Sequence, residues 1–303
     1  MTSPPALLLV CDVSRDRGAA EAFRSFVDEL AGDHADLTVA GALREPSGPS
    51  VSDAAAALAA EGATRIAAVP LTLVSDEFAE RDVPAALSRA EEEHEGLSCT
   101  GGAALGPQPA MLALLERRIE EALSRGAASG GGSGNSRDDG NGSEDGNGIP
   151  AARTPDDRAR ITVLLVSPGS TDAHANAEVH RAARLLWEGR GYEGVEPAFV
   201  TSAAPDVASA LDRCRKLGAR KVVVQPCFLF AGDLSERVRQ QSEGWGLANP
   251  QVEVVVAGVV GADAALAEVV LERYRETVRR MPGRPQEPHG TEDGATRPGS
   301  HAR

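Results

Sequence analysis

Two kinds of hydrophobic pattern alternate along the first 126 residues. Short, largely apolar runs that are typical of buried strands occur at 6–10, 37–43, 65–74 and 97–105. Apolar residues recur at helical spacing in the segments between and after them, at 19–31, 51–62, 83–96 and 111–123. Gly62 is expected to end the second helix, and Pro84 to lie in the first turn of the third. Four strand–helix units in succession predict a mainly parallel sheet with helices on both faces.

The whole pattern returns later in the chain at a constant offset. GATRIAAVP (62–70) corresponds to GARKVVVQP (218–226), and VCDVSRD (10–16) corresponds to VSPGSTD (166–172). LGPQPAML (105–112) corresponds to VGADAALA (260–267) with one residue of slippage. We therefore predict an internal duplication: two α/β domains, each a four-stranded, mainly parallel sheet flanked by helices, that face each other across a cleft.

Composition indicates where these domains begin and end. Residues 127–158 are rich in Gly, Ser, Asn and Asp and nearly free of large apolar side chains, which is typical of a flexible linker. The segment 281–303 has the same character and is expected to be a disordered tail. The N-terminal domain is then predicted at 5–126 and the C-terminal domain at 159–280.

The net charge of the chain limits the kinds of molecule that it is expected to bind. A net charge of −14 would repel phosphate backbones, so we expect no nucleic-acid partner. No apolar run is long enough to span a membrane, and the first residues do not resemble a signal peptide, so we predict a cytoplasmic protein. The four cysteines show no CxxC spacing, which argues against a disulfide framework.

The candidate site follows from the predicted topology. Ligands of parallel sheets bind beyond the carboxyl ends of the strands, which places the loops 11–16, 75–81, 167–174 and 231–236 around a common site. These loops carry groups that could hold a divalent cation, namely Asp12, Asp76, Glu77, His174 and Asp233. Plainer roles fit as well, because Asp76 and Glu77 suit a solvated turn, His174 a helix start, and Asp233 a helix cap with Glu236.

Three segments of the second block carry a family resemblance. They are NAEVHRAARLLWEGRGYEGVEPAF (176–199), LDRCRKLGARKVVVQPCFLFAGDLSERV (211–238) and LERYRE (271–276), and the loops VCDVSRD and PLTLVSDEFAERDVP extend the likeness to the first block. The chain resembles the long, two-domain form of the sirohydrochlorin chelatases, which insert Co²⁺ or Fe²⁺ into a tetrapyrrole in cobalamin or sirohaem synthesis. The resemblance implies a sirohydrochlorin-like substrate, a substrate metal rather than a resident cofactor, and substrate contacts from Ser14, Arg15 and Ser170.

The histidines of that family do not carry over. Its two histidine positions fall on Asp12 and Phe78 in the first block, and on Pro168 and Leu234 in the second. Asp12 is therefore the candidate catalytic residue. Three hypotheses remain open: a chelatase that works with carboxylates, a catalytically silent relative that binds a tetrapyrrole or a partner chelatase, and a divalent-metal-binding protein on the same fold.

Overall fold

The computed structural model describes residues 4–13, 16–44, 48–74, 76–129 and 155–282. Within them the chain forms two four-stranded sheets, and every strand pair is parallel, which confirms the predicted fold class. None of the helices in these ranges is long and apolar enough to cross a membrane.

The first sheet is ordered β2-β1-β3-β4. Its strands are β1 (Ala6–Cys11), β2 (Val39–Leu43), β3 (Arg65–Pro70) and β4 (Ser98–Gly101). The helices of this half are α1 (Arg17–Asp33), α2 (Val51–Ala60), α3 (Val83–Glu93) and α4 (Pro109–Ser129), with a π-helical turn η1 (Phe78–Asp82) before α3.

The second sheet repeats this order as β6-β5-β7-β8. Its strands are β5 (Thr162–Ser167), β6 (Gly194–Phe199), β7 (Lys221–Pro226) and β8 (Glu253–Val256). The helices are α5 (Pro155–Arg158), α6 (Ala173–Trp187), α7 (Val207–Lys216), α8 (Asp233–Ala248) and α9 (Ala264–Arg280).

Several element boundaries differ from the sequence prediction. The third strand ends at Pro70 rather than at residue 74, because the neighbouring strand β1 pairs with β3 only as far as Pro70. Beyond it, Leu71 donates one hydrogen bond to Val10 O and the chain turns away with Leu71 and Leu73 buried. Helix α4 continues to Ser129 and α5 covers 155–158, so both edges of the predicted linker are helical. Residues 130–154 and 283–303 lie outside the described residues.

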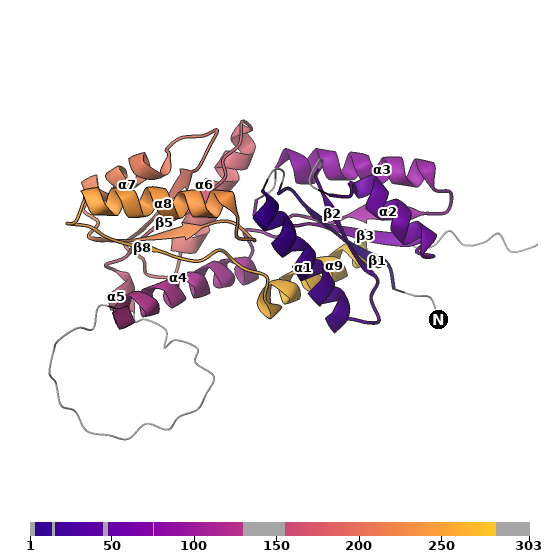
Figure 1. Cartoon of the computed structure of the whole chain (residues 1–303), viewed down its shortest axis with the longest axis horizontal. Helices are drawn as coiled ribbons and strands as arrows, with labels where there is room; N and C mark the ends of the chain where they lie inside the picture. Colours follow the sequence, from indigo (N-terminus) through magenta and orange to yellow (C-terminus); the bar gives the residue numbers. More distant parts are fainter. Residues whose placement is uncertain (1–3, 14–15, 45–47, 75, 130–154, 283–303) are drawn as a thin grey trace, which may run out of the picture.

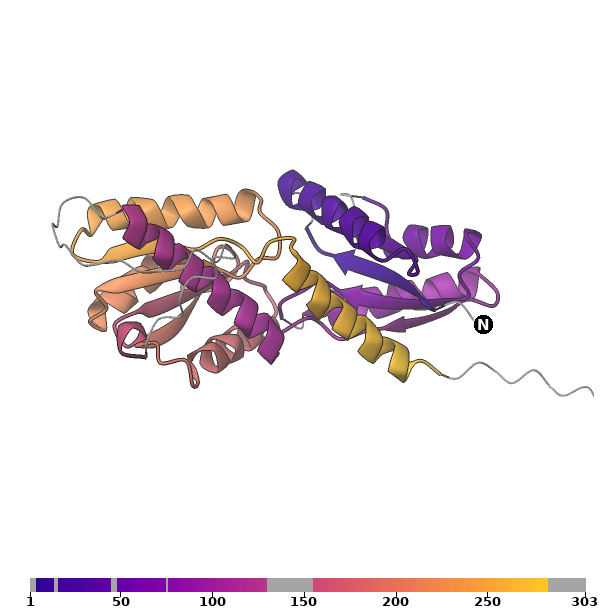
Figure 2. The same cartoon turned by 90° about the horizontal axis from the view of Figure 1, so that it is seen from below.

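The last helix of each half covers the sheet of the other half. Helices α2 and α3 cover one face of the first sheet, and α1 lies on its second face together with α9 from the end of the chain. In the second sheet, α7 and α8 cover one face, while α6 and α4 cover the other (Figures 1 and 2). The predicted blocks 5–126 and 159–280 thus each supply one sheet, and each sheet is completed by a helix of the other block.

Polar contacts hold the exchanged helices in place. On the second sheet, Glu116 of α4 accepts hydrogen bonds from Arg158 (2.5 Å) and Arg190 (3.0 Å). On the first sheet, the Tyr274 hydroxyl of α9 donates to Pro5 O at 2.6 Å. The apolar faces of α1, α4, α6 and α9 form one continuous core cluster shared by both halves.

Candidate functional site

A cavity of about 510 Å³ lies between the two halves, at the carboxyl ends of β1, β3, β5 and β7. This volume lies within the range of pockets that bind small organic molecules. The cavity lies at the edge of the sheets where the predicted topology places a ligand site. The cavity is lined from the first half by Asp12, Asp16, Arg44, Asp76, Glu77 and Phe78, among others, and from the second half by Ser167–Thr171, Cys227–Phe230, Leu234 and Ser235.

The guanidinium of Arg44 connects several side chains of the first half. Arg44 follows directly after β2 and donates to Asp12 at 2.9 Å and to Asp82 at 3.1 Å. Its guanidinium carbon also lies 5.5 Å from the centre of the Phe78 ring, which is cation–π distance. The hydrogen bond from Arg44 to Asp12 is the main cause that raises the pKa of this arginine. Phe78 is itself buried, so the ring forms a fixed surface under the ion pairs.

The surroundings of Asp76 favour the neutral form of its carboxyl group over the ionised form. It accepts a hydrogen bond from Ala79 N at 2.9 Å and so caps the turn η1. Burial raises its pKa above the usual aspartate value, and the nearby charge of Asp12 raises it further, against the opposing effects of that hydrogen bond and of Arg44. A carboxylate with a raised pKa is a better proton acceptor near neutral pH than an ordinary one.

The wall formed by the second half carries no charged side chain among the described lining residues. The loop after β5 is held by Ser170 and Asn176: Ser170 N donates to Asn176 Oδ1 at 3.0 Å, and Asn176 Nδ2 donates back to Ser170 O at 2.8 Å. The Ser170 hydroxyl accepts a bond from Asp172 N at 3.0 Å. Beside this loop, Phe228, Leu229 and Leu234 present apolar surface to the cavity.

One side of the cleft is closed by direct contact between the halves. Phe230 packs its ring against Phe23 and Phe26 of α1, with 5.9 Å between ring centres in each pair. Beside these rings, a β-carbon placed on Gly232 would lie 2.1 Å from a carboxylate oxygen of Asp16. A side chain at position 232 would therefore require the Asp16 carboxylate to move from its present position.

A second cavity of about 460 Å³ adjoins the first and shares Glu77 and Thr171 with it. The rest of its lining is Glu80, Arg81 and Asp172. Arg81 forms an ion pair with Glu77, the residue four positions before it. A ligand would therefore reach the cleft between η1 and the start of α6.

The structure brings together part of the predicted site. Asp12, Asp76, Glu77 and Ser170 line the cavity, whereas His174 and Asp233 are exposed in the first turns of α6 and α8 and are not among its lining residues. Ser14 and Arg15 lie outside the described residues.

The five predicted metal ligands are not assembled into one centre. Within the described ranges, no three His, Cys, Asp or Glu side chains lie close enough to hold a metal ion. Cys11 and Cys227 also line the cavity, and burial raises the pKa of the Cys11 thiol and raises that of Cys227 to about 12.

The sequence prediction missed Arg44, which lines the cavity, and its partner Asp82, which does not line it but accepts a hydrogen bond from Arg44. A signal for Arg44 was present, since it follows the second predicted strand, and β2 pairs with β1 so that Leu43 lies beside Cys11. For Asp82 no local signal exists, because it lies at the junction of η1 and α3 and its contact with Arg44 joins positions 38 residues apart.

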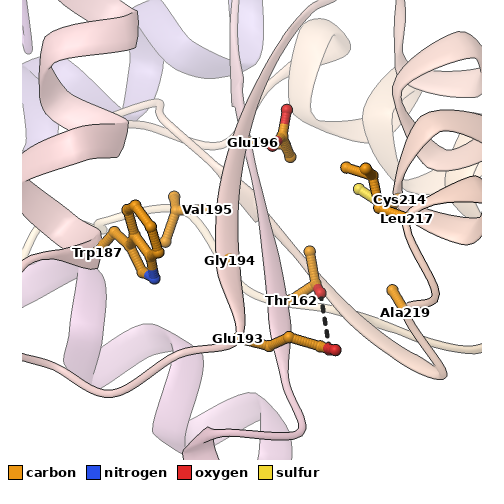
Figure 3. Close-up of a pocket in the computed structure, with 9 residues that line it drawn as sticks. All are labelled: Thr162, Trp187, Glu193, Gly194, Val195, Glu196, Cys214, Leu217 and Ala219. Atoms are coloured by element: carbon orange, nitrogen blue, oxygen red, sulfur yellow. Dashed lines mark hydrogen bonds between the residues drawn. The ribbon is translucent and has the colours of Figure 1, made fainter.

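A separate pocket of about 290 Å³ lies along the edge strand β6, away from the cleft. Figure 3 shows Trp187 and Val195 on one side of this strand, and Glu196, Cys214 and Leu217 on the other. The Thr162 hydroxyl donates to Glu193 at 3.2 Å, and burial raises the pKa of Cys214 to about 12. This pocket lies at the side of one sheet rather than at the strand ends of both, so the cleft is the stronger candidate site.

Comparison with known proteins gives consistent matches over both halves. The CbiX family model matches residues 6–122 and again residues 162–277. A sirohydrochlorin cobaltochelatase of Priestia megaterium is 28% identical over 272 residues, which cover 89% of this chain and 79% of the relative. A sirohydrochlorin ferrochelatase of the same organism is 24% identical, with 89% of each chain covered.

Solved structures show the same fold. SirB from Bacillus subtilis, determined with Fe³⁺, superposes with a TM-score of 0.68 over 91% of this chain and 96% of its own, at 20% identity. At this level of identity the likeness concerns the arrangement of the two sheets and their helices, and it leaves the chemistry of the cleft to be argued from the residues themselves.

Proposed function

Because this chain belongs to the CbiX family of sirohydrochlorin chelatases, we propose that its cleft binds sirohydrochlorin or a closely related tetrapyrrole and inserts Co²⁺ or Fe²⁺ into it with the help of carboxylates. The observation that carries the proposal is the cavity between the strand ends of both sheets, with one charged and one uncharged wall. A planar, largely apolar ring with polar substituents matches two walls of this kind.

The walls have different tasks in this proposal. The apolar residues Phe228, Leu229 and Leu234 cover a face of the macrocycle and exclude water from it. Metal insertion releases two pyrrole protons, and Asp76 is the carboxylate suited to accept a proton because its pKa is raised. Asp12 lies on the same wall and supplies negative charge near the metal once the macrocycle is bound.

A second candidate is binding of the tetrapyrrole without metal insertion. It is favoured by the engagement of Asp12 with Arg44 and by the lack of a three-ligand group among the described residues. Such a protein would serve as a carrier of the macrocycle or as a partner of an active chelatase.

Anaerobic insertion assays distinguish the two candidates. Sirohydrochlorin is incubated with Co²⁺ or Fe²⁺ and followed by absorbance, with the wild type, Asp12→Ala and the exposed α1 control Asp28→Ala. We expect turnover above the spontaneous rate in the wild type and the control, and a loss of about tenfold or more in Asp12→Ala. Spectral evidence of binding without turnover would support the second candidate, and the absence of any tetrapyrrole binding would refute both.

A further inference from the structure

The position between Asp12 and Asp82 is already occupied by a positive charge. Arg44 gives one N–H to each carboxylate, at 2.9 and 3.1 Å, and its guanidinium lies over the face of Phe78. Two carboxylates and the face of an aromatic ring form a surrounding that attracts a cation. In this protein the cation is a side chain of the same wall.

We propose that Arg44 is a specificity-determining residue of the cleft, because its guanidinium takes the place of a divalent metal ion beside Asp12 and keeps free Co²⁺ and Fe²⁺ from binding there. In naming these metals the proposal rests on the proposed function. It concerns a property of the free protein, namely that the charged wall does not collect divalent cations before the macrocycle is present.

Comparison of the two halves shows that these ion pairs are not required by the fold. At the same offset as the sequence repeat, the positions of Asp12, Arg44 and Asp82 correspond to Pro168, Val200 and Val238. The strand pairing supports this correspondence, since Leu43 lies beside Cys11 in the first sheet and Phe199 beside Ser167 in the second. The second half builds the same sheet and helices with apolar residues at all three places.

The other carboxylates of the wall also have partners. Asp16 accepts a bond from Ala19 N at 3.0 Å, Asp76 accepts one from Ala79 N at 2.9 Å, and Glu77 pairs with Arg81. Arg81 also pairs with Asp82, at 3.6 Å. Arg44 bonds both Asp12 and Asp82, so its removal takes away the positive charge that lies between these two carboxylates.

Co²⁺ titration of the tag-free, full-length protein without any tetrapyrrole tests the proposal. Arg44→Gln removes the charge, and Arg44→Lys keeps it. Arg89→Gln is a matched change at an exposed arginine of α3 that donates to Ala85 O of its own helix. We expect Arg44→Gln to bind Co²⁺ about tenfold or more tightly than the wild type. Arg44→Lys and Arg89→Gln should remain close to the wild type.

Asp12→Asn locates the effect. Added to Arg44→Gln, it should abolish the gain in Co²⁺ affinity, and alone it should leave the weak binding of the wild type unchanged. The proposal is overturned if Arg44→Gln binds Co²⁺ no better than the wild type, if Arg44→Lys gains as much as Arg44→Gln, or if Asp12→Asn alone weakens Co²⁺ binding. The measurement on Asp12→Asn alone needs no Arg44 variant, so it tests the proposal even if Arg44→Gln does not fold.

These titrations are independent of the proposed function. Tetrapyrrole binding by the wild type is measured separately, by the change in absorbance of sirohydrochlorin. A failure to bind the macrocycle would refute the proposed function and leave the Co²⁺ result standing. Unchanged Co²⁺ affinity in Arg44→Gln, together with tetrapyrrole binding, would refute only the role of Arg44.

Discussion

Asp76 illustrates how a single residue of the cleft is changed by its surroundings. Its side chain is partly withdrawn from water and lies near the negative charge of Asp12, and both effects raise its pKa. The folded protein therefore holds a proton on Asp76 more strongly than the unfolded chain does. Ionised Asp76 costs stability above its folded-state pKa, and this cost disappears as the pH falls below the unfolded-state value of about 4.

Asp76→Asn should therefore stabilise the protein at neutral pH but not in acid. Asparagine keeps an oxygen that can accept the bond from Ala79 N and removes the ionisable group. We expect the melting temperature to rise by roughly 1–3 °C at pH 7–8, and the difference from the wild type to shrink towards zero near pH 4. Thermal melts of both proteins across this range provide the measurement, and a difference that does not vary with pH would contradict the assignment.

At the scale of elements, the exchanged helix α9 depends on a close approach to the first sheet. A β-carbon on Gly102 would lie 2.4 Å from the Thr277 hydroxyl oxygen of α9 and 3.0 Å from Ala68 O of β3. The glycine after β4 therefore makes room for a helix that arrives from the other end of the sequence. Apolar burial along α9, from Leu266 to Tyr274, then holds the helix on the sheet.

Gly102→Ala should destabilise the protein because the new methyl group pushes α9 away from β3. We expect a loss of about 1–3 kcal/mol in the free energy of unfolding. Gly32→Ala in α1 is the matched control, since nothing lies within 4 Å of its added β-carbon and alanine favours a helix. Denaturant unfolding of both variants compares them, and equal stabilities would show that α9 does not need the close contact.

At the scale of the whole molecule, the helix exchange makes the two halves dependent on each other. The first sheet has α9 on one face, and the second sheet has α4 in the corresponding place (Figure 2). Ion pairs of Glu116 and Glu120 with Arg158 fasten α4 to the second half. Each half without the other would expose the apolar face that the exchanged helix covers.

A single cut in the segment 130–154 should therefore not separate the two pieces. With a protease site inserted there, we expect the cleaved protein to elute as one particle of unchanged size under native conditions and to separate in denaturant. The pieces 1–129 and 155–303, produced alone, should be insoluble or unfolded, and should recover structure when refolded together. Two pieces that elute separately after cleavage would contradict the role of the exchanged helices.

Much of this architecture was predictable from local patterns. The alternation of apolar runs and helical spacings predicted both sheets, and the repeat predicted that the halves share one fold. The position of the cleft followed, because parallel strands place their carboxyl ends at one edge. Asp12 and Asp76 were identified as residues of the cleft for this reason, and both line it in the structure.

The number, type and order of the main strands and helices in each half could be read from the sequence, since burial on one face requires a period along the chain. The sheet that each last helix covers could not be read in this way, because the apolar stripe of a helix such as α4 does not specify which sheet it packs against. The charge pairs at the cleft also depend on the tertiary structure. The pairing of Arg44 with Asp12 and Asp82 joins three segments that are distant in sequence, and no local pattern records which charges meet there.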